Sequence, residues 1–433
     1  MRRKYLFVGQ ILLLLLVASA LYFGSHHITR LPAPIRLPVG DSSSNNGSEG
    51  SKENTGSSYT YSGVISAENI TRYVNSIFDS KSEDLPRLKC PDIPSPSRYD
   101  SLRTSATAPE NGPETKYFFA IDLRDTVTLL PRLLGSVVET IKFLGPASCA
   151  LSIVEGNSHD GTYDVLQAIR PALDDIDTTY FLRSSDIDPK EGDRIAKLAK
   201  LRNLALQPLI DGNVPGANEE TTVVFLNDVA ACTEDILELV HQRRQLGADM
   251  TCGMDWVYVG EHPTFYDVWV ARGMNGDSFF EIPADGNWNS AWNLFWNNGD
   301  AKASLNAHKP FQVFSCWNGA TVFTAKPLLD DASSVRFRGP HDGECKQGEP
   351  QLFCKDLWFH GYGKIAVVPS VNLEYSDANA QKIKDLKGYT SRWTSESGEE
   401  EGKIEWNSSP PENVKCIPSY ENQTFRPWNE TLG

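Results

Sequence analysis

Short apolar runs alternate with amphipathic segments through the middle of this chain. The apolar runs have the length of buried strands and lie at 117–123, 149–155, 179–182, 222–226 and 248–254. The segments between them follow a helical period and lie at 130–144, 162–169, 194–209 and 233–247. Strands that alternate with helices predict a mostly parallel, Rossmann-like sheet that helices flank on its faces. We therefore expect an α/β fold.

Two of the expected strands end in acids. Glu155 is the last residue of one strand, and Asn227 and Asp228 directly follow another. Open α/β sheets bind ligands at the carboxyl ends of their strands, so we expect Glu155 and Asp228 to share a cleft. Two carboxylates at that edge would suit a nucleotide diphosphate with a divalent ion, one for the base or ribose and one for the metal. Turn formation is the alternative, because Asn and Asp also favour turns.

The loop after Glu155 has the same two interpretations. Asn157 and Asp160 lie in it, between a strand and a helix. Such a connection uses these residue types for turns and helix caps, yet the same side chains would also face a ligand at the sheet edge.

Arg202 and Glu349 are charged residues in apolar surroundings. Arg202 lies in the centre of the apolar stripe of the helix at 194–209, so its guanidinium needs an anion or several carbonyl groups as partners. That anion is either a structural carboxylate at a strand end or a nucleotide phosphate. Glu349 precedes Pro350 at an expected helix start, where its carboxylate either favours the helix dipole or faces the site.

Tryptophan, asparagine and glycine crowd the later segments. Aromatic faces and amides suit sugar rings, although such tryptophans also fill cores. The residues concerned are Trp256, Trp269, Trp288, Trp292, Trp296 and Trp317-Asn318-Gly319.

The amino terminus predicts entry into the secretory pathway. Basic residues at 2–4 precede an uncharged run at 5–24 that is long enough to cross a bilayer. A cleavable signal peptide is the competing interpretation, because Ala18-Ser19-Ala20 resembles a cleavage site. We expect a cytoplasmic tail at 1–4, a signal-anchor at 5–24, a flexible lumenal stem at 25–110, a catalytic domain at 111–395 and a polar tail at 396–433.

Sequons and cysteines agree with that compartment. The sequons cluster outside the middle of the chain, at Asn46, Asn69, Asn407, Asn422 and Asn429. The chain has 8 cysteines, an even number that suits disulfides in an oxidising compartment, but their connectivity cannot be deduced. A zinc site from His341, Cys345, Cys354 and His360 is the alternative, and its spacing matches no standard motif. The acidic balance, 56 Asp plus Glu against 41 Lys plus Arg, argues against nucleic acid as a partner.

Taken as a set and in order, six motifs between Lys116 and Tyr389 resemble the fungal capsule-associated α-1,3-mannosyltransferases of glycosyltransferase family 69. They are Ser152–Thr162, Arg194–Asn203, Phe225–Val229, Phe265–Arg272, Phe311–Gly319 and Leu352–Trp358. The resemblance implies a single-pass type II Golgi membrane protein with a GT-A catalytic domain in its lumenal part. It also implies GDP-mannose as donor and Mn²⁺, or Mg²⁺, as cofactor.

The resemblance also implies roles for individual residues. Asn227-Asp228-Val229 stands where GT-A enzymes usually have Asp-x-Asp; this chain lacks the second acid, so the metal is assigned to Asp228. The donor-binding residues are expected to be Glu155, Asn157, Asp160, Arg194, Arg202, Asn227 and Asp228.

Transfer from GDP-α-mannose into an α-1,3 linkage retains the anomeric configuration. The acceptor hydroxyl then attacks from the leaving-group face, or a carboxylate first forms a covalent sugar ester. Asp255, Asp267 and Glu349 are the candidate carboxylates, and Arg272 is a candidate cation for the departing diphosphate. The expected acceptor is a mannoside or polysaccharide of fungal capsule or wall. Two alternatives stay open: another donor, as in xylosyl or glucuronyl transfer, and a catalytically silent Golgi glycan-binding scaffold.

Overall fold

A ten-stranded sheet runs through the part of the chain that the computed structural model describes, which is residues 64–93, 96–104, 114–330, 334–396 and 403–432. Its strands are β1 (Tyr117–Leu123), β2 (Cys149–Glu155), β3 (Thr179–Ser184), β4 (Thr222–Leu226), β5 (Met250–Val259), β6 (His262–Phe265), β7 (Arg272–Gly273), β8 (Phe311–Ser315), β9 (Ala320–Thr324) and β10 (Ile365–Glu374). Their order is β3-β2-β1-β4-β9-β5-β10-β8-β7, and β6 pairs with β5.

Most of the sheet is parallel, as the sequence predicts. β1 to β4 form parallel ladders, and β5 pairs in parallel with β10. β9 lies antiparallel between β4 and β5, so β1 to β5 and β10 all run in one direction. The carboxyl ends of these strands therefore meet at one edge of the sheet.

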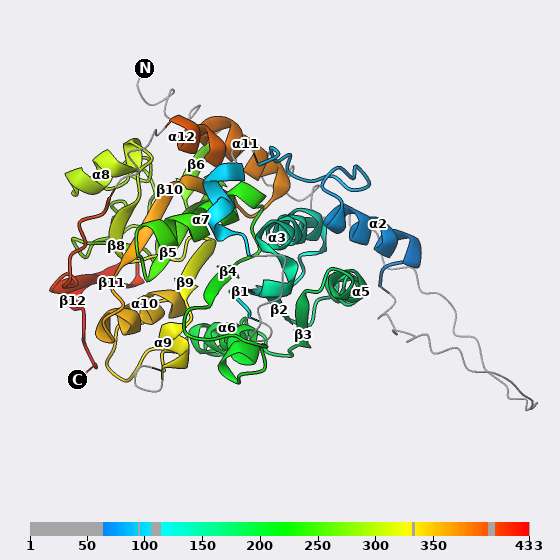
Figure 1. The fold of residues 1–433 in the computed structure, drawn as a ribbon. Coiled ribbons are helices and arrows are strands. Elements are labelled where there is room, and N and C mark those ends of the chain that lie inside the picture. The colour runs from blue at the N-terminus through cyan, green and yellow to red at the C-terminus, as the bar shows by residue number, and fades with distance from the viewer. Residues whose placement is uncertain (1–63, 94–95, 105–113, 331–333, 397–402, 433) are drawn as a thin grey trace, which may run out of the picture. The chain divides into compact units, whose positions relative to one another are not determined.

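Helices cover both faces of the sheet (Figure 1). Alternate residues of β1 point to opposite faces of the sheet. Phe118 and Ala120 belong to the core beneath the helix Arg194–Ile210 (α6), whereas Phe119 and Ile121 belong to the core beneath the helices Leu130–Leu144 (α3) and Thr233–Gln245 (α7). The helices are α2 (Ala67–Phe78), α3 (Leu130–Leu144), α4 (Thr162–Ala168), α5 (Arg170–Asp174), α6 (Arg194–Ile210), α7 (Thr233–Gln245), α8 (Gly299–Asn306), α9 (Lys326–Leu329), α10 (Glu349–Phe359), α11 (Asp377–Lys387) and α12 (Thr390–Glu396).

The folded body extends beyond 111–395 in both directions. In the predicted stem, α2 buries Ile70 and Ile77 in the core that it shares with α3. In the predicted polar tail, the hairpin of β11 (Asn413–Ser419) and β12 (Asn422–Pro427) buries Ile417. Both segments join the folded body because each carries a few apolar residues on a short helix or hairpin. Burying these residues stabilises the packing against the domain, even where the surrounding sequence is polar.

The described residues contain no helix of sufficient length and hydrophobicity to span a bilayer. The predicted anchor at 5–24 and the sequon at Asn46 lie outside the described residues. The remaining sequon residues, Asn69, Asn407, Asn422 and Asn429, are exposed.

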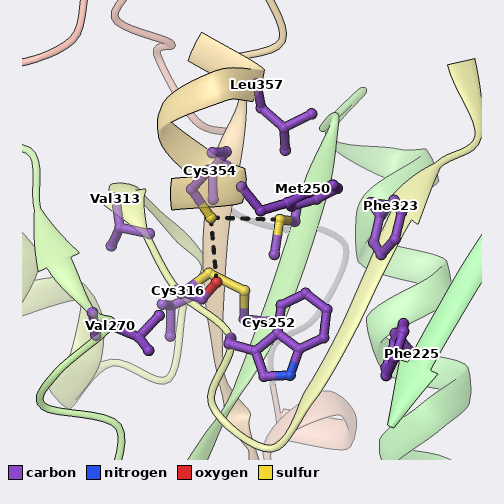
Figure 2. Packing of buried hydrophobic residues seen from close by; sticks show 14 of the residues in the cluster. Phe225, Met250, Cys252, Val270, Val313, Cys316, Phe323, Cys354 and Leu357 are labelled. Carbon is purple, nitrogen blue, oxygen red and sulfur yellow. Dashed lines mark hydrogen bonds between the residues drawn. A yellow bond between two sulfur atoms is a disulfide. The ribbon is translucent and has the colours of Figure 1, made fainter. Parts of the chain in front are cut away.

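Six cysteines form three disulfides, Cys90–Cys232, Cys252–Cys316 and Cys345–Cys416. The last one ties the hairpin to the loop before α10. Cys149 and Cys354 are buried thiols, and Figure 2 shows Cys354 beside the Cys252–Cys316 disulfide, with its sulfur 3.5 Å from the carbonyl oxygen of Cys316. The zinc alternative is wrong, because Cys345 is bonded to Cys416 and Cys354 packs in the core.

Candidate active site

A cleft of about 650 Å³ opens at the carboxyl edge of the sheet, and we call it the central cleft. Its walls include four carboxylates and three cations: Asp122, Asp228, Asp267, Glu349, Arg194, Arg202 and Lys346. A smaller cavity of about 260 Å³, the side hollow, shares Asp122, Arg194, Leu198 and Asp228 with it. The two spaces therefore adjoin, and three of the four residues that they share are charged.

Asp228, the acid that follows β4, lines both spaces. The chain leaves β4 with the Asn227 N–H donating to the Gly319 carbonyl (2.9 Å) and the Ala230 N–H donating to the Glu374 carbonyl (2.8 Å). These bonds tie the turn that carries Asp228 to the residue before β9 and to the last residue of β10. Burial, and then the negative charge of Asp122, raise the pKa of Asp228 to about 6.

Asp122 is the second strand-end carboxylate in this cleft, and it was not among the residues predicted from the sequence. It lies one residue before the end of β1, and β1 pairs with β4. Its side chain lines both the central cleft and the side hollow. A single charge in an otherwise apolar strand was the signal that could have found it.

Glu155 is at the same edge but does not face the cleft. Its carboxylate accepts from the Ser158 N–H (2.6 Å) and the Ser184 hydroxyl (3.2 Å), so it closes its own loop. Its neighbour Gly156 lines the side hollow instead. The donor-binding role predicted for Glu155 is therefore not supported by its geometry, because its two oxygens already serve the turn.

Asn157 and Asp160 also follow the turn interpretation. The Asp160 carboxylate accepts from the backbone and hydroxyl of Thr162 and from the Val127 N–H (2.9 Å), at the start of α4. Asn157 has a positive φ of 55° and is exposed. Neither residue is among those that line the cleft or the hollow in the described structure. Their residue types favour turns first, which explains the error.

Arg202 points from α6 into the centre of the cleft floor. Its Nε donates to Glu349 Oε1 (2.9 Å), its Nη1 donates to Asn227 Oδ1 (3.2 Å), and its guanidinium carbon lies 4.5 Å from the centroid of the Trp317 ring. Burial alone would lower the pKa of Arg202, but the Asp122 and Glu349 carboxylates raise it. Arg202 therefore forms a structural salt bridge, and its anionic partner is Glu349, the first residue of α10.

The same contacts decide the role of Asn227. Its amide oxygen accepts from both Arg202 and the Trp317 indole N–H (2.9 Å). An oxygen with two donors is not free to bind a metal. Asn227 thus orients the cleft floor beside Asp228.

Asp267 is a candidate carboxylate that faces the cleft without a cationic side chain at ion-pair distance in the described structure. Its Oδ2 accepts from the Asn318 N–H (2.7 Å), in the turn between β8 and β9. Burial raises the pKa of Asp267, whereas the Asn318 N–H and the positive charge of Arg202 lower it.

Asp255 is one layer deeper than Asp267. It is fully buried, and Tyr375, which lines the cleft, donates its hydroxyl to Asp255 Oδ2 (2.6 Å). Burial and the charge of Asp267 raise the pKa of Asp255 well above its usual value. Asp255 therefore supports the wall through Tyr375 and does not itself reach the cleft.

Arg272 is not brought to the cleft. Its guanidinium is fully buried and donates to the carbonyls of Val268, Ala271 and Lys415 and to Gln347 Oε1. Burial lowers the pKa of Arg272 to about 9. The predicted role with the diphosphate is wrong on this geometry, because the donors are used to hold β7 against the C-terminal hairpin.

Aromatic side chains complete the walls. Trp269, Trp288 and Trp317 line the central cleft, as their residue type suggested, together with Tyr266 and Tyr375. Trp269 packs against Tyr420 of the hairpin at 4.9 Å between ring centroids, and Ile417 and Pro418 close the wall there. Lys346 and Arg194 contribute positive charge at the rim.

The residues present fit a divalent ion held partly by a ligand. No three His, Cys, Asp or Glu side chains within the described ranges converge to form a complete metal site. Asp122 and Asp228 nevertheless line the same space, and burial, followed by the negative charge of Asp122, raises the pKa of Asp228. Hard cations such as Mg²⁺ bind through one or two carboxylates plus phosphate oxygens and water, and Mn²⁺ takes the same ligands.

Known proteins with similar sequences agree on one family. The model of the family described as Cryptococcal mannosyltransferase 1 matches residues 116–356. Alpha-1,3-mannosyltransferase CMT1 of Cryptococcus neoformans var. neoformans serotype D is 36% identical over 365 residues, which are 79% of this chain and 78% of that protein.

Solved structures are more distant. The mannosyltransferase PcManGT from Pyrobaculum calidifontis, in complex with GDP-Man and Mn²⁺, is 11% identical with a TM-score of 0.37, over 65% of this chain and 63% of that one. TarS 1–349 of S. aureus is 14% identical with a TM-score of 0.35, over 63% and 62%. Scores this low support no conclusion about activity. On the sequence matches, the chain belongs to the Cryptococcal mannosyltransferase 1 family.

Proposed function

We propose that this protein is a retaining α-1,3-mannosyltransferase of GT-A type that moves mannose from GDP-mannose to a mannose-containing acceptor in fungal capsule or wall glycan. The family match supports mannose transfer. The observation that carries the proposal for this chain's own site is the pair Asp122 and Asp228, which face one cleft from the ends of adjacent parallel strands.

The two connected spaces suit the two ends of a sugar nucleotide. The side hollow, between Gly156 and Pro189 on one wall and Leu198 on another, would take the nucleoside. Asp122 and Asp228 would then hold a divalent ion against the diphosphate at the junction of hollow and cleft. When bound, that ion neutralises charge on the departing diphosphate. Arg194 lines both spaces and Lys346 lines the central cleft, and their positive charges would add to this neutralisation.

Asp267 is the carboxylate we assign to the reacting sugar. Glu349 is neutralised by Arg202, and Asp255 is covered by Tyr375. Asp267 lines the cleft, and the Asn318 N–H holds one of its oxygens in place. An ionised Asp267 would stabilise positive charge at the anomeric carbon, or bond to it, before the acceptor hydroxyl takes its place.

We further propose that the protein is a type II Golgi membrane protein, with residues 5–24 as its anchor and the described domain in the lumen. Three disulfides suit an oxidising compartment. The exposure of Asn69, Asn407, Asn422 and Asn429 is compatible with glycan attachment in that compartment.

The test is transfer by the purified full-length protein from a panel of sugar nucleotides to a mannose disaccharide, with and without Mn²⁺. We expect transfer from GDP-mannose, dependent on the metal, and a new α-1,3 linkage by NMR. Asp228→Asn should abolish transfer, whereas the matched control Asp175→Asn, at an exposed position after α5, should not. Transfer from another sugar nucleotide in preference to GDP-mannose would contradict the donor assignment.

A further inference from the structure

A second, larger space adjoins the central cleft, and we call it the aromatic groove. It has a volume of about 1120 Å³ and lies between β5, β6, α8, α11, α12 and the segment 288–294. Trp288 lines both the aromatic groove and the central cleft, so the two share a wall. α8, β6, α11 and α12 can be located in Figure 1.

Trp292 is the open aromatic face of this groove. Its side chain is 81% exposed, which is unusual for a residue of its size. Two other tryptophans of the groove are already covered: Lys387 Nζ lies 3.5 Å from the Trp256 ring centroid, and His308 stacks on Trp393 at 3.5 Å. Trp292 therefore offers an uncovered aromatic face in a groove whose lining is mostly apolar, with several amide side chains among it.

Amide side chains line the same groove. Asn289, Asn293 and Asn306 line the groove, and the Asn293 side chain accepts from Lys302 of α8 (2.6 Å), which anchors the segment that carries Trp292. Sugar rings have an apolar face that packs on aromatic rings and hydroxyls that bond to amides. Both kinds of group occur here side by side.

Size and charge narrow the ligand further. The groove exceeds the range of about 300–1,000 Å³ typical of pockets for one small molecule, so a single sugar would not fill it. Among the described residues that line it, none is Asp or Glu, and Lys302 and Lys387 are cations. In a chain of net charge −15, such a lining does not select a basic peptide.

We propose that the aromatic groove binds the body of an extended saccharide acceptor, several units beyond the sugar that receives mannose, with Trp292 as a stacking platform. The inference rests on the proposed function and adds the acceptor class: an oligosaccharide chain, not a single mannoside. Trp288 marks the point where the chain passes from the groove into the central cleft.

The experiment compares acceptor length with the full-length protein. Initial rates are measured with GDP-mannose, Mn²⁺ and a mannose disaccharide, tetrasaccharide or hexasaccharide, for the wild type, Trp292→Ala and Trp292→Phe. Calorimetric titration of the hexasaccharide, without donor, measures binding separately. Phe425→Ala is the matched control, because Phe425 is also an exposed aromatic (52%) but lies on β12, outside the groove.

We expect KM to fall as the acceptor lengthens in the wild type and in Phe425→Ala. Trp292→Ala should raise KM for the hexasaccharide by about tenfold, the loss expected from one aromatic contact, and leave the disaccharide KM unchanged. Trp292→Phe should recover part of the loss. Transfer that shows no dependence on length, with no hexasaccharide binding, overturns the groove assignment while the proposed function stands. Absence of transfer to every acceptor rejects the proposed function, and the titration then still decides whether the groove binds saccharide.

Discussion

The buried pair of Arg202 and Glu349 allows a quantitative test of how the cleft floor is held. Their side chains are 9% and 4% exposed, and Nε and Oε1 are 2.9 Å apart. Arg202→Met removes the cation and leaves the Glu349 carboxylate buried without its counter-charge. Removing one partner of such a pair typically costs about 3–5 kcal/mol, which for a domain of this size is a fall in melting temperature of about 5–8 °C.

The same geometry predicts the outcome for the double replacement. Arg202→Met/Glu349→Met leaves no buried charge and keeps similar volume, so it should cost less than the two single changes together, with a coupling of about 0.5–3 kcal/mol. Thermal and urea unfolding followed by circular dichroism measure all three variants. Calorimetric titration with GDP, at a temperature where each variant is folded, measures the donor site.

Donor affinity should change little in Arg202→Met. Two of the five N–H donors of Arg202 already bond to Glu349 and Asn227, and its guanidinium carbon lies 4.5 Å from the centroid of the Trp317 ring, so protein groups hold the guanidinium in the cleft floor and its charge is balanced by Glu349. A melting temperature within 1–2 °C of the wild type, combined with a tenfold loss of GDP affinity, would refute this reasoning and give Arg202 to the donor phosphate.

Three further predictions concern the carboxylate pair and the hairpin. Asp122→Asn and Asp228→Asn should each reduce transfer by at least about a hundredfold, because one of two protein ligands of the metal is lost. Calorimetry should also show weaker Mn²⁺-linked GDP binding. Near-normal rates in either variant would remove that residue from the metal site. Burial raises the pKa of Asp228 to about 6 in the metal-free protein, so GDP binding at a subsaturating Mn²⁺ concentration should weaken as pH falls through about 6, because the proton competes with the cation; binding that is independent of pH in this range would contradict the assignment. The raised pKa also means that the folded state holds this proton more tightly than the unfolded state. This group therefore makes the metal-free protein less stable as pH rises from about 4 to 6, and Asp228→Asn should remove that part of the melting-temperature profile. Replacing Cys345 and Cys416 by Ser opens a loop of 71 residues and should lower the free energy of unfolding by about 4 kcal/mol through loop entropy. Transfer activity should also fall, because Ile417 and Pro418 of that hairpin line the cleft. An unchanged melting temperature would show that the hairpin packs without its disulfide.

The alternation of strands and helices was sufficient to predict the sheet. Hydrophobic periodicity is local, so β1, β2, β4, α3 and α6 appear where the pattern indicates, within a few residues. The same pattern did not reveal that β9 inserts antiparallel between β4 and β5, because strand pairing joins segments far apart in the chain.

The sequence indicated that Asp228 lies at the ligand-binding edge of the sheet, but it did not indicate that Asp122 lies beside it. Because a parallel sheet collects the carboxyl ends of its strands at one edge, any acid that follows such a strand reaches that edge. Which of several acids then faces the cleft depends on local hydrogen bonds. Glu155 is held by Ser158 and Ser184, and Asp122 on the neighbouring strand faces the cleft.

Local patterns in the chain were enough to predict the α/β class, the sheet edge where the site lies and the family. Only the packing of distant segments revealed that Arg202 pairs with Glu349, that Arg272 bonds to backbone carbonyls, which cysteines form disulfides, and that Trp292 is exposed in a groove beside the cleft. Hydrophobic periodicity depends on residues that are close together in the chain, so a local pattern can predict it. The partner of a buried charge, or the exposure of a ring, depends on packing between segments that are far apart in the chain, so no local pattern predicts it.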